Sequence, residues 1–486
     1  MCVIDKSIPE RGLPQRVMKR TKNAYFYMVT ISALYFLMIL LLHSRIQVEL
    51  CQIGTGNHKT EVHNHSFSNQ DDFDKWFSKR SQEMSSRKNS NCHVSPESRN
   101  FTFQTVADNL FYVYTAYLDT RTNITYVRIM SIFIKERKDS VLVFCSFKKE
   151  NGESLLVRAV KYEMCENHNK RYGGWIMSCP LPTNFSEPCQ VEIGIFQPTD
   201  PFFSSNNVTL NIMKLSPSSA KLKYAVCIPP LFGNVSHSSL IDFMEFTTYF
   251  GAEKFIFYTH AINDEKSLKA LEYYNNRSLV TVIPWKLPDV IQDTNMWYHG
   301  QLIAHNDCLY RSMSLTNKLA IQDIDELIVP HDGNLFWDQA LAPLFNDNVV
   351  GLGIQSAFFD PALEGEVLAI SSIRRTKVFS RFRTKVLVKP SSIFEVGIHH
   401  VSKPLLETYK IISPDTNKVV LHHYRSCLSN YGMNCKDWVI DQTIRSKYSH
   451  IRQRVMETKS IISKLVGHKP EDNAQNVNIS QNKLFL

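Results

Sequence analysis

The sequence predicts an α/β fold: a mostly parallel sheet with helices on both faces, preceded by a smaller β-rich domain and an N-terminal transmembrane helix. Three observations support this. Residues 24–42 form an apolar run without a charge. Short segments rich in β-branched and aromatic residues follow between residues 101 and 215. From residue 221 onward, strand-like and helix-like segments alternate, which is typical of a parallel sheet.

The composition is that of a globular protein with about two to three domains. The 486 residues are 43% hydrophobic and 21% charged, and the formal net charge is +9. No block of basic residues interleaved with aromatics occurs, so we expect no nucleic-acid binding. Cys2 precedes the apolar run, and the other ten of the eleven cysteines follow it. An even number on one side of the run favours an oxidising compartment there.

Residues 24–42 are long enough to cross a membrane as a helix. Nineteen residues at about 1.5 Å each span about 28 Å, which matches the hydrocarbon core of a bilayer. Residues 1–23 carry six basic side chains, so we expect them to form a cytosolic tail. This arrangement predicts a single-pass type II membrane protein with the remaining chain in a lumen.

Polar segments flank the predicted folded parts. Residues 43–98 lack apolar periodicity and predict a flexible stem, and residues 466–486 predict a disordered tail. Every Asn-x-Ser/Thr triplet lies beyond the predicted anchor, in agreement with a lumenal body. These triplets begin at Asn64, Asn100, Asn123, Asn184, Asn207, Asn234, Asn276 and Asn478.

Residues 99–220 predict a small β-sandwich. Segments 111–114, 126–129, 141–144 and 191–195 are separated by turn-forming residues. Four cysteines in this region would staple the sandwich, although the pairing cannot be deduced from sequence. No acid/base constellation is present here, so we assign the domain a structural or glycan-positioning role.

Residues 221–465 predict the α/β domain. We expect strands at residues 224–228, 254–259, 279–283 and 318–325, and helices at residues 238–250, 264–274, 297–314 and 450–465. Ligands of such sheets bind beyond the carboxyl ends of the strands.

Asp323 and Asp325 lie at the end of the fourth predicted strand. In an extended chain they would share a face, and two desolvated carboxylates repel each other. A divalent cation such as Mn²⁺ or Mg²⁺ removes that cost and often bridges to phosphate. The pair therefore predicts a metal site for a nucleotide diphosphate. A solvated turn is the alternative, since Asp72 and Asp74 have the same spacing without a preceding strand.

Several segments together resemble glycosyltransferase family 92. They are residues 227–234 (CIPPLFGN), 297–302 (WYHGQL), 307–309 (DCL), 323–326 (DIDE), 397–400 (GIHH) and 423–424 (HY). The likeness covers residues 100–450. It implies a GT-A-type Golgi enzyme: an inverting β-1,4-galactosyltransferase that uses UDP-galactose and a divalent cation, usually manganese. Such enzymes extend galactose or fucose on glycans, here expected on glycoproteins. The oligomeric state stays open, a homodimer included.

The resemblance also implies roles for single residues. Asp325 would be a direct metal ligand, and Asp323 would contact the ribose or the metal. His399 or His400 would complete the metal shell, because neutral imidazole suits manganese. His423 is a rival for that role.

Four residues on the helix before the acidic pair match the same family motif. They would line the pocket for the sugar nucleotide or simply pack the helix. They are Trp297, His299, Gln301 and Asp307.

A carboxylate must accept the proton of the attacking hydroxyl. Glu395 is the first candidate, and Glu326 and Asp360 are alternatives, although Glu326 would also suit a supporting role. The basic residues between 374 and 385 form either a diphosphate clamp or a solvated strand face. Gln322 departs from the asparagine that is frequent at this family position.

A second hypothesis from another class is a catalytically inactive, membrane-anchored glycan-binding protein. The retained acids and histidines argue against it. A hydrolase is not supported, because the sequence has no Gly-x-Ser-x-Gly motif.

Overall fold

The computed structural model describes residues 102–148, 154–183, 185, 187–197, 206–216, 218, 220–361, 366–428 and 434–467. All of these fall within one compact unit, residues 63–486. The predicted cytosolic tail, anchor and stem lie outside the described residues, as does the predicted tail from residue 468 onward. Within the described part, no helix has the length and apolar character needed to span a membrane.

The predicted β-rich domain is present as a nine-stranded sheet with the strand order β5-β4-β8-β9-β2-β3-β7-β6, and β1 pairs with β2. A disulfide between Cys145 in β4 and Cys179 in β7 joins strands that are distant in this order. The sheet therefore folds over so that its two halves face each other, as in a sandwich. Its strands are β1 (Gln104–Ala107), β2 (Phe111–Asp119), β3 (Thr125–Ile134), β4 (Leu142–Lys148), β5 (Ser154–Arg158), β6 (Val160–Glu163), β7 (Tyr172–Leu181), β8 (Gln190–Phe196) and β9 (Val208–Lys214), with a 3₁₀ turn η2 (Lys135–Arg137).

The α/β domain is built on an eleven-stranded sheet with the order β12-β11-β10-β13-β17-β15-β16-β22, to which β14, β20 and β21 attach. Its strands are β10 (Leu222–Gly233), β11 (Lys254–Ile262), β12 (Val280–Pro284), β13 (Thr316–Ile321), β14 (Glu326–Pro330), β15 (Val349–Phe359), β16 (Arg374–Thr376), β17 (Ser380–Val388), β20 (Lys410–Ile412), β21 (Val419–Tyr424) and β22 (Trp438–Ile440). A separate hairpin pairs β18 (Ile393–Val396) with β19 (Val401–Pro404).

The prediction of a mostly parallel sheet is correct only for its first half. Strands β12, β11, β10 and β13 are parallel. The next neighbour, β17, runs antiparallel to β13 and to β15, and β14 runs antiparallel to β21. Antiparallel neighbours need no crossover helix. The chain after residue 345 has only short helical turns between its strands, and the sheet is therefore mixed.

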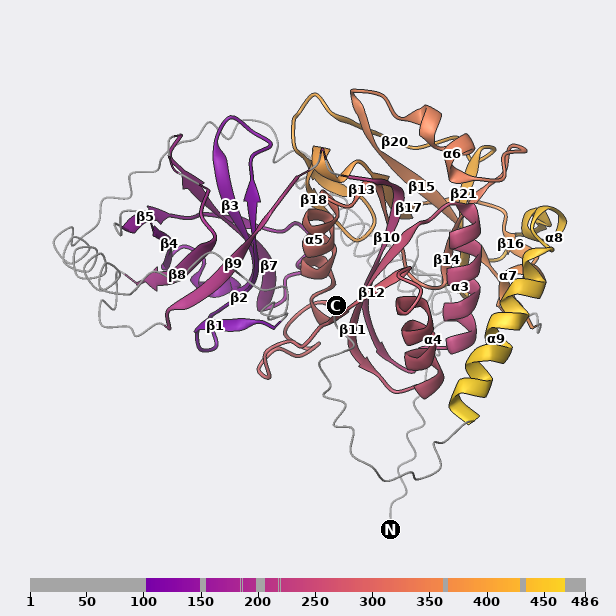
Figure 1. Cartoon of the computed structure of the whole chain (residues 1–486). Helices are drawn as coiled ribbons and strands as arrows, with labels where there is room; N and C mark the ends of the chain where they lie inside the picture. The colour runs from indigo at the N-terminus through magenta and orange to yellow at the C-terminus, as the bar shows by residue number, and fades with distance from the viewer. Residues whose placement is uncertain are drawn as a thin grey trace, which may run out of the picture. The chain divides into compact units, whose positions relative to one another are not determined.

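Helices cover both faces of the parallel strands, as predicted (Figure 1). On one side, α3 (His237–Phe250), α4 (Glu265–Asn275) and α9 (Ile451–Gly467) pack against one another. The side chains of Ser236 and Asp264 cap the starts of α3 and α4. The shorter helical turns are η4 (Tyr298–Gly300), α6 (Trp337–Ala340), η5 (Ala342–Leu344), α7 (Leu368–Ser371), η6 (Pro390–Ser392) and α8 (Thr443–Lys447).

Helix α5 (Gln301–Ser312) covers the other face and is buried along nearly its whole length. It packs against β10 and β13 of the α/β sheet and against β3 and β7 of the β-rich domain. Its Cys308 forms a disulfide with Cys227 in β10. The two domains therefore share one hydrophobic core, in which α5 is the common element.

Asp307 of α5 is the polar centre of this interface. Its fully buried carboxylate accepts hydrogen bonds from Thr115 Oγ1 and Tyr117 Oη, each at 2.6 Å, and from Tyr258 Oη at 2.5 Å. Arg311 Nη2 lies 3.0 Å away and supplies the compensating charge. Asp307 has no exposed surface with which to contact a nucleotide. Its placement therefore does not support the predicted role in the donor pocket.

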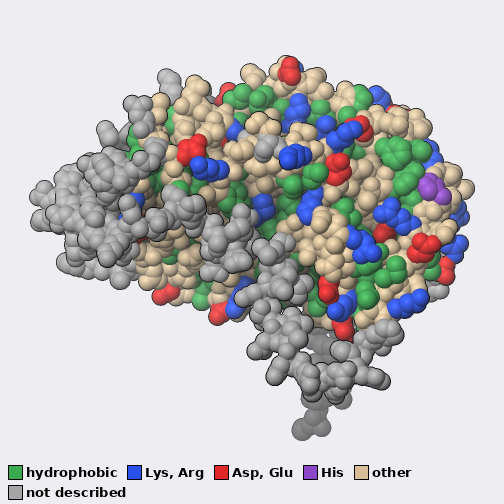
Figure 2. Space-filling view, viewed as in Figure 1, with side chains coloured by type: hydrophobic (Ala, Val, Ile, Leu, Met, Phe, Trp, Pro, Cys, Tyr) green, Lys and Arg blue, Asp and Glu red, His purple; other side chains and the backbone are tan. Residues whose placement is uncertain are grey.

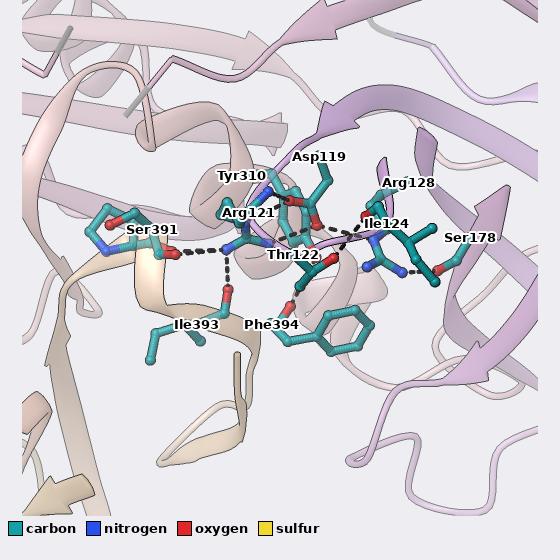
Figure 3. A network of polar contacts seen from close by, with 11 residues as sticks. Asp119, Arg121, Thr122, Ile124, Arg128, Ser178, Tyr310, Ser391, Ile393 and Phe394 are labelled. Carbon is teal, nitrogen blue, oxygen red and sulfur yellow. Dashed lines mark hydrogen bonds and ion pairs between the residues drawn. The ribbon is translucent and has the colours of Figure 1, made fainter. Parts of the chain in front are cut away.

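A second polar network fastens the β-rich domain to the start of β18 (Figure 3). Arg121 Nε lies 2.8 Å from Asp119 Oδ1, and its Nη1 donates to the carbonyl of Ile393 at 2.7 Å. Arg128 Nε contacts the other Asp119 oxygen at 3.1 Å. Both guanidinium groups are almost fully buried, so this network fixes the position of the hairpin that carries Glu395.

Basic and acidic side chains are mixed on the face of the molecule that Figure 2 shows. Figure 2 shows Lys and Arg side chains interspersed with Asp and Glu side chains, with hydrophobic side chains between them.

We predict that Asp307→Asn destabilises the protein by about 3–5 kcal/mol, because it removes the buried carboxylate charge that faces Arg311 and accepts from three hydroxyl groups. The measurement is the thermal midpoint, with Asp347→Asn at an exposed position as the matched control. A midpoint for Asp307→Asn equal to that of the control would show that the interface does not depend on this carboxylate.

Candidate active site

The acidic pair lies in a turn at the carboxyl edge of the parallel strands. Strand β13 ends at Ile321, and Gln322 N still donates to the carbonyl of Cys227 in β10 at 3.1 Å. Asp323 and Asp325 follow in the turn, and the prediction that the strand runs on to Asp325 is wrong. Glu326 begins β14, and its Oε2 accepts a hydrogen bond from Asp323 N at 3.0 Å. This bond closes the turn.

A buried lysine sits beside the turn. Lys385 Nζ lies 2.9 Å from Asp323 Oδ2 and 3.7 Å from Glu326 Oε2, and its side chain has no exposed surface. It comes from β17, whose antiparallel pairing with β13 places Val386 opposite Ile321. The interpretation of the basic strip as a solvated face is therefore wrong for Lys385.

These charges act on one another. Burial alone would raise the pKa of Asp323, but the adjacent Lys385 ammonium outweighs it, and the pKa is lowered. Burial raises the pKa of Glu326, and the Asp323 charge adds to this against the opposing effect of Lys385. Burial acts to lower the pKa of Lys385, yet Asp323 and Glu326 raise it overall. Asp323 therefore stays ionised, while Glu326 holds its proton more readily than an ordinary glutamate.

His423 is the imidazole that meets the acids. Its Nε2 lies 3.4 Å from Asp325 Oδ2, and its Nδ1 lies 3.6 Å from Glu326 Oε1. The register of β14 with β21 pairs Glu326 with His423, and Phe358 stacks on the His423 ring at 4.9 Å. Burial acts to lower the pKa of His423, but Glu326 and Asp325 raise it.

Asp325 and His423 lie close enough together to share a divalent cation, with Asp323 beside them in the same turn. The Asp323 and Asp325 side chains are 33% and 35% exposed, so both carboxylates reach the surface while their neighbours are buried. Two carboxylates and one imidazole are oxygen and nitrogen ligands of the kind that Mn²⁺ accepts.

The structure does not bring His399 or His400 to Asp325 in the same way. His399 Nδ1 lies 3.0 Å from the Thr384 carbonyl, and its Nε2 lies 3.2 Å from Arg383 Nη1. His400 Nδ1 lies 3.8 Å from Glu166 Oε1. Both rings are thus engaged by other partners, whereas His423 is the histidine in contact with Asp325.

The three candidate bases differ in access. Glu395 is fully buried and accepts hydrogen bonds from Tyr162 Oη at 2.7 Å and from Cys165 N at 2.9 Å. Glu326 is also buried, so neither carboxylate presents a face to an acceptor hydroxyl. Asp360 follows β15 beside β21, and its side chain is 23% exposed, with Arg374 Nη1 at 3.9 Å. The placement favours Asp360 over Glu395 and Glu326.

An aromatic edge, which we define as Phe232, Trp297, Tyr298 and His299, lies at the carboxyl end of β10. The His299 ring centroid is 3.9 Å from that of Phe232, and His299 Nδ1 is 3.0 Å from Asp293 Oδ1. Trp297 and Tyr298 are 37% and 49% exposed, which is high for large apolar side chains. Of the predicted donor residues, Trp297 and His299 belong to this edge, whereas Gln301 is buried at the start of α5.

The backbone at the aromatic edge is strained. Tyr298, His299 and Gly300 have φ angles of 45°, 52° and 71° in succession. Residues other than glycine rarely adopt a positive φ angle, and such backbone strain is concentrated at functional sites.

Comparison with known proteins identifies the domain that carries these groups. Residues 223–463 match the model of glycosyltransferase family 92. The chain belongs to glycosyltransferase family 92 through this domain.

Two curated relatives extend the match. The β-1,4-galactosyltransferase galt-1 of Caenorhabditis elegans is 26% identical over 325 residues, covering 65% of this chain and 75% of the relative. The galactan β-1,4-galactosyltransferase GALS1 of Arabidopsis thaliana is 22% identical over 321 residues, covering 60% of this chain and 62% of the relative. The family 92 protein is therefore a glycosyltransferase with relatives named as galactosyltransferases.

Solved structures give weaker likenesses. Glucosyl-3-phosphoglycerate synthase from Mycobacterium tuberculosis, in complex with Mn²⁺, UDP and phosphoglyceric acid, is 10% identical, with a TM-score of 0.23 over 50% of this chain and 78% of that chain. Mannosyltransferase PcManGT from Pyrobaculum calidifontis, in complex with GDP-Man and Mn²⁺, is 11% identical, with a TM-score of 0.25 over 54% and 78%. Scores this low establish no shared fold.

We predict that His423→Asn weakens Mn²⁺ binding in the presence of UDP by at least about tenfold, whereas His399→Asn changes it much less. Isothermal titration of both variants is the measurement. A larger loss of Mn²⁺ affinity in His399→Asn than in His423→Asn would instead indicate His399 as the metal ligand.

A second prediction concerns pH. Burial raises the pKa of Glu395 from 4.5 to about 7, against its hydrogen bonds from Tyr162 and Cys165. The folded state therefore holds this proton more tightly than the unfolded state does. Between pH 4.5 and pH 7 Glu395 ionises in the unfolded state but keeps its proton in the folded state. The free energy of unfolding therefore falls as the pH rises through this range, by up to about 3 kcal/mol.

Glu395→Gln removes this titration, so wild type should lose thermal stability relative to the variant between pH 5 and pH 7.5. Other titrating groups are common to both proteins and cancel. Glu407→Gln, at an exposed position, is the control and should show no such trend. A stability difference between wild type and Glu395→Gln that is constant with pH would contradict the assignment.

Proposed function

We propose that this family 92 protein is a metal-dependent, inverting glycosyltransferase of GT-A type that transfers galactose from UDP-galactose. The observation that carries the proposal is the contact between Asp325 and His423 in the turn after β13, beside Asp323 at the carboxyl edge of the parallel strands. The names of the relatives support galactose and a β-1,4 linkage. The proposed acceptor is a galactose or fucose residue of a glycoprotein glycan.

Asp325 and His423 would hold Mn²⁺ or Mg²⁺, and Asp323 would contact the ribose or the metal. When bound, the cation offsets charge that develops on the leaving UDP. Lys385 keeps Asp323 ionised, so that this carboxylate is ready to act as an acceptor of hydrogen bonds or as a ligand. Glu326 fixes the turn through Asp323 N and touches His423, which makes it a positioning residue.

Asp360 is the proposed general base. It would take the proton of the acceptor hydroxyl as that oxygen attacks the anomeric carbon from the face opposite UDP, and the configuration inverts. General-base assistance of this kind contributes about 10²–10⁴-fold to a rate. Its open side chain beside the strand of His423 supports this role better than the buried Glu395 or Glu326.

Trp297 and His299 of the aromatic edge would line the pocket for the sugar nucleotide, as the family motif implies. Their exposure, the neighbouring Phe232 and the strained backbone support a binding role. Gln301 would hold the start of α5 in place rather than contact the nucleotide.

We further propose a Golgi location with residues 24–42 as a type II membrane anchor, and a homodimer as one candidate assembly. Disulfides within the described residues, at Cys145–Cys179, Cys227–Cys308 and Cys427–Cys435, support an oxidising lumen. The asparagines of the sequons at residues 123, 234 and 276 are exposed, so all three are open to glycosylation.

One observation favours the alternative of an inactive glycan-binding protein. Lys385 already neutralises Asp323, so the acidic turn is partly satisfied without any cation. Activity with and without Mn²⁺ separates the two hypotheses.

The test is UDP release from UDP-galactose by the full-length protein, with UDP-glucose and UDP-N-acetylglucosamine as competing donors. We expect release to require Mn²⁺ and to be abolished in Asp325→Ala, whose thermal midpoint should stay near that of wild type because Asp325 is partly exposed. Asp347→Asn is the matched control. Release that survives in Asp325→Ala, or that is absent in wild type with every donor and acceptor, would overturn the proposal.

A further inference from the structure

A second cluster of metal-ligating side chains lies on the opposite face of β21 from His423. Successive residues of a strand point to opposite faces of a sheet. His423 therefore faces the acidic turn, while His422 faces His331 and Asp441. The nitrogen and oxygen ligand atoms of His331, His422 and Asp441 all lie within 4.8 Å of one another.

The three residues come from three separate elements. His331 follows β14, His422 lies within β21, and Asp441 follows β22. The two imidazoles meet through their Nε2 atoms at 2.8 Å, across 91 positions of sequence. The fold therefore gathers two nitrogen ligands and one carboxylate that no local motif brings together.

Each ligand is oriented by its surroundings. Phe359 stacks on the His422 ring at 4.1 Å, and Tyr424 Oη lies 3.4 Å from His422 Nδ1, which leaves Nε2 facing the cluster. Asp441 accepts hydrogen bonds from Thr443 N at 3.0 Å and from Arg375 Nε at 2.7 Å. Metal-binding side chains are commonly held in this way by partners outside the coordination sphere.

We infer that His331, His422 and Asp441 form a zinc site distinct from the proposed manganese site. Two imidazoles and one carboxylate make up a ligand set that zinc uses with water in a fourth position. Such a nitrogen-rich set prefers zinc to the hard cations that favour oxygen alone.

Two basic side chains close to the cluster, Arg375 and Lys447, oppose the binding of a cation. Arg375 already pairs with Asp441, and Lys447 Nζ donates to the His331 carbonyl at 2.7 Å. Without a metal, His331 and His422 would share one hydrogen bond, and Asp441 would serve Arg375 and Thr443. A carboxylate offers about four acceptor positions, however, so the two bonds to Asp441 leave room for a metal.

The zinc would act as a structural cross-link near the active site. It would tie β14 and β21 to the segment after β22, and β14 and β21 also carry Glu326 and His423. Zinc at this cluster would therefore stabilise the strand pair that positions the proposed manganese ligands without itself touching the sugar nucleotide.

The test uses full-length protein stripped with a chelator, dialysed against zinc and freed of excess metal. We expect about one zinc per chain by elemental analysis and a higher thermal midpoint than the stripped protein. Cobalt in place of zinc should give the visible absorption of a four-coordinate site, which reports geometry independently of activity.

His331→Gln and Asp441→Asn should lose both the bound zinc and the rise in thermal midpoint. His450→Gln, at an exposed histidine, is the matched control and should keep both. Asp325→Ala should also keep them, which separates this inference from the proposed activity. Two variants are used because His331 and Asp441 follow different strands, so the second variant still tests the inference if the first fails to fold.

Wild type with no retained zinc would overturn the inference, as would equal zinc retention and stabilisation in His331→Gln. Zinc that is lost in Asp325→Ala but kept in His331→Gln would also contradict it, because the metal would then belong to the acidic turn.

Discussion

The contact between the buried Lys385 ammonium and the Asp323 carboxylate is the interaction on which the rest of the site depends. A buried charge without a partner costs several kcal/mol, so the fully buried Lys385 ammonium requires an acidic partner such as Asp323. The Lys385 ammonium also lies 3.7 Å from Glu326, which closes the turn by accepting from Asp323 N. Because the Lys385 ammonium balances the Asp323 charge, the turn can hold a second carboxylate, Asp325, at the surface beside His423.

This local arrangement follows from the switch in strand direction within the sheet. The parallel strands β10 to β13 bring their carboxyl ends to one edge, where ligands of such sheets bind. Strand β17 then runs antiparallel to β13 and delivers Lys385 to that same edge. Strand β21 pairs antiparallel with β14 and delivers His423. The mixed half of the sheet thus supplies the partners of the acids that the parallel half positions.

Helix α5 links this edge to the β-rich domain. Its start adjoins the aromatic edge, its Cys308 is bonded to β10, and its Asp307 is held by hydroxyl groups from both domains. Because α5 is buried on all sides, the aromatic edge cannot shift without disturbing the shared core. The β-rich domain therefore contributes to the geometry of the glycosyltransferase domain through packing.

The sequence predicted well those features that depend on local pattern. The alternation predicted from residue 224 to residue 321 reproduces the observed strands and helices. The mixed half of the sheet was missed because short strands without helices between them leave the direction of pairing undetermined.

Side-chain roles that depend on tertiary partners were missed for a related reason. Asp307 matched a family motif, yet three hydroxyl groups distant in sequence occupy it. Lys385 lies in a basic strip, and only the apolar run Val386 to Val388 after it hinted at burial. His305 is fully buried beside Lys385 in α5, and no sequence motif indicated that a histidine at this position would be buried. Burial of a charged residue is set by its tertiary neighbours.

The most direct measurement is anomalous diffraction from crystals of the protein grown with Mn²⁺ and UDP. We predict a manganese peak at coordination distance from the Asp325 carboxylate and His423 Nε2. Bound UDP without manganese at this turn, or with manganese held by other residues, would contradict the account.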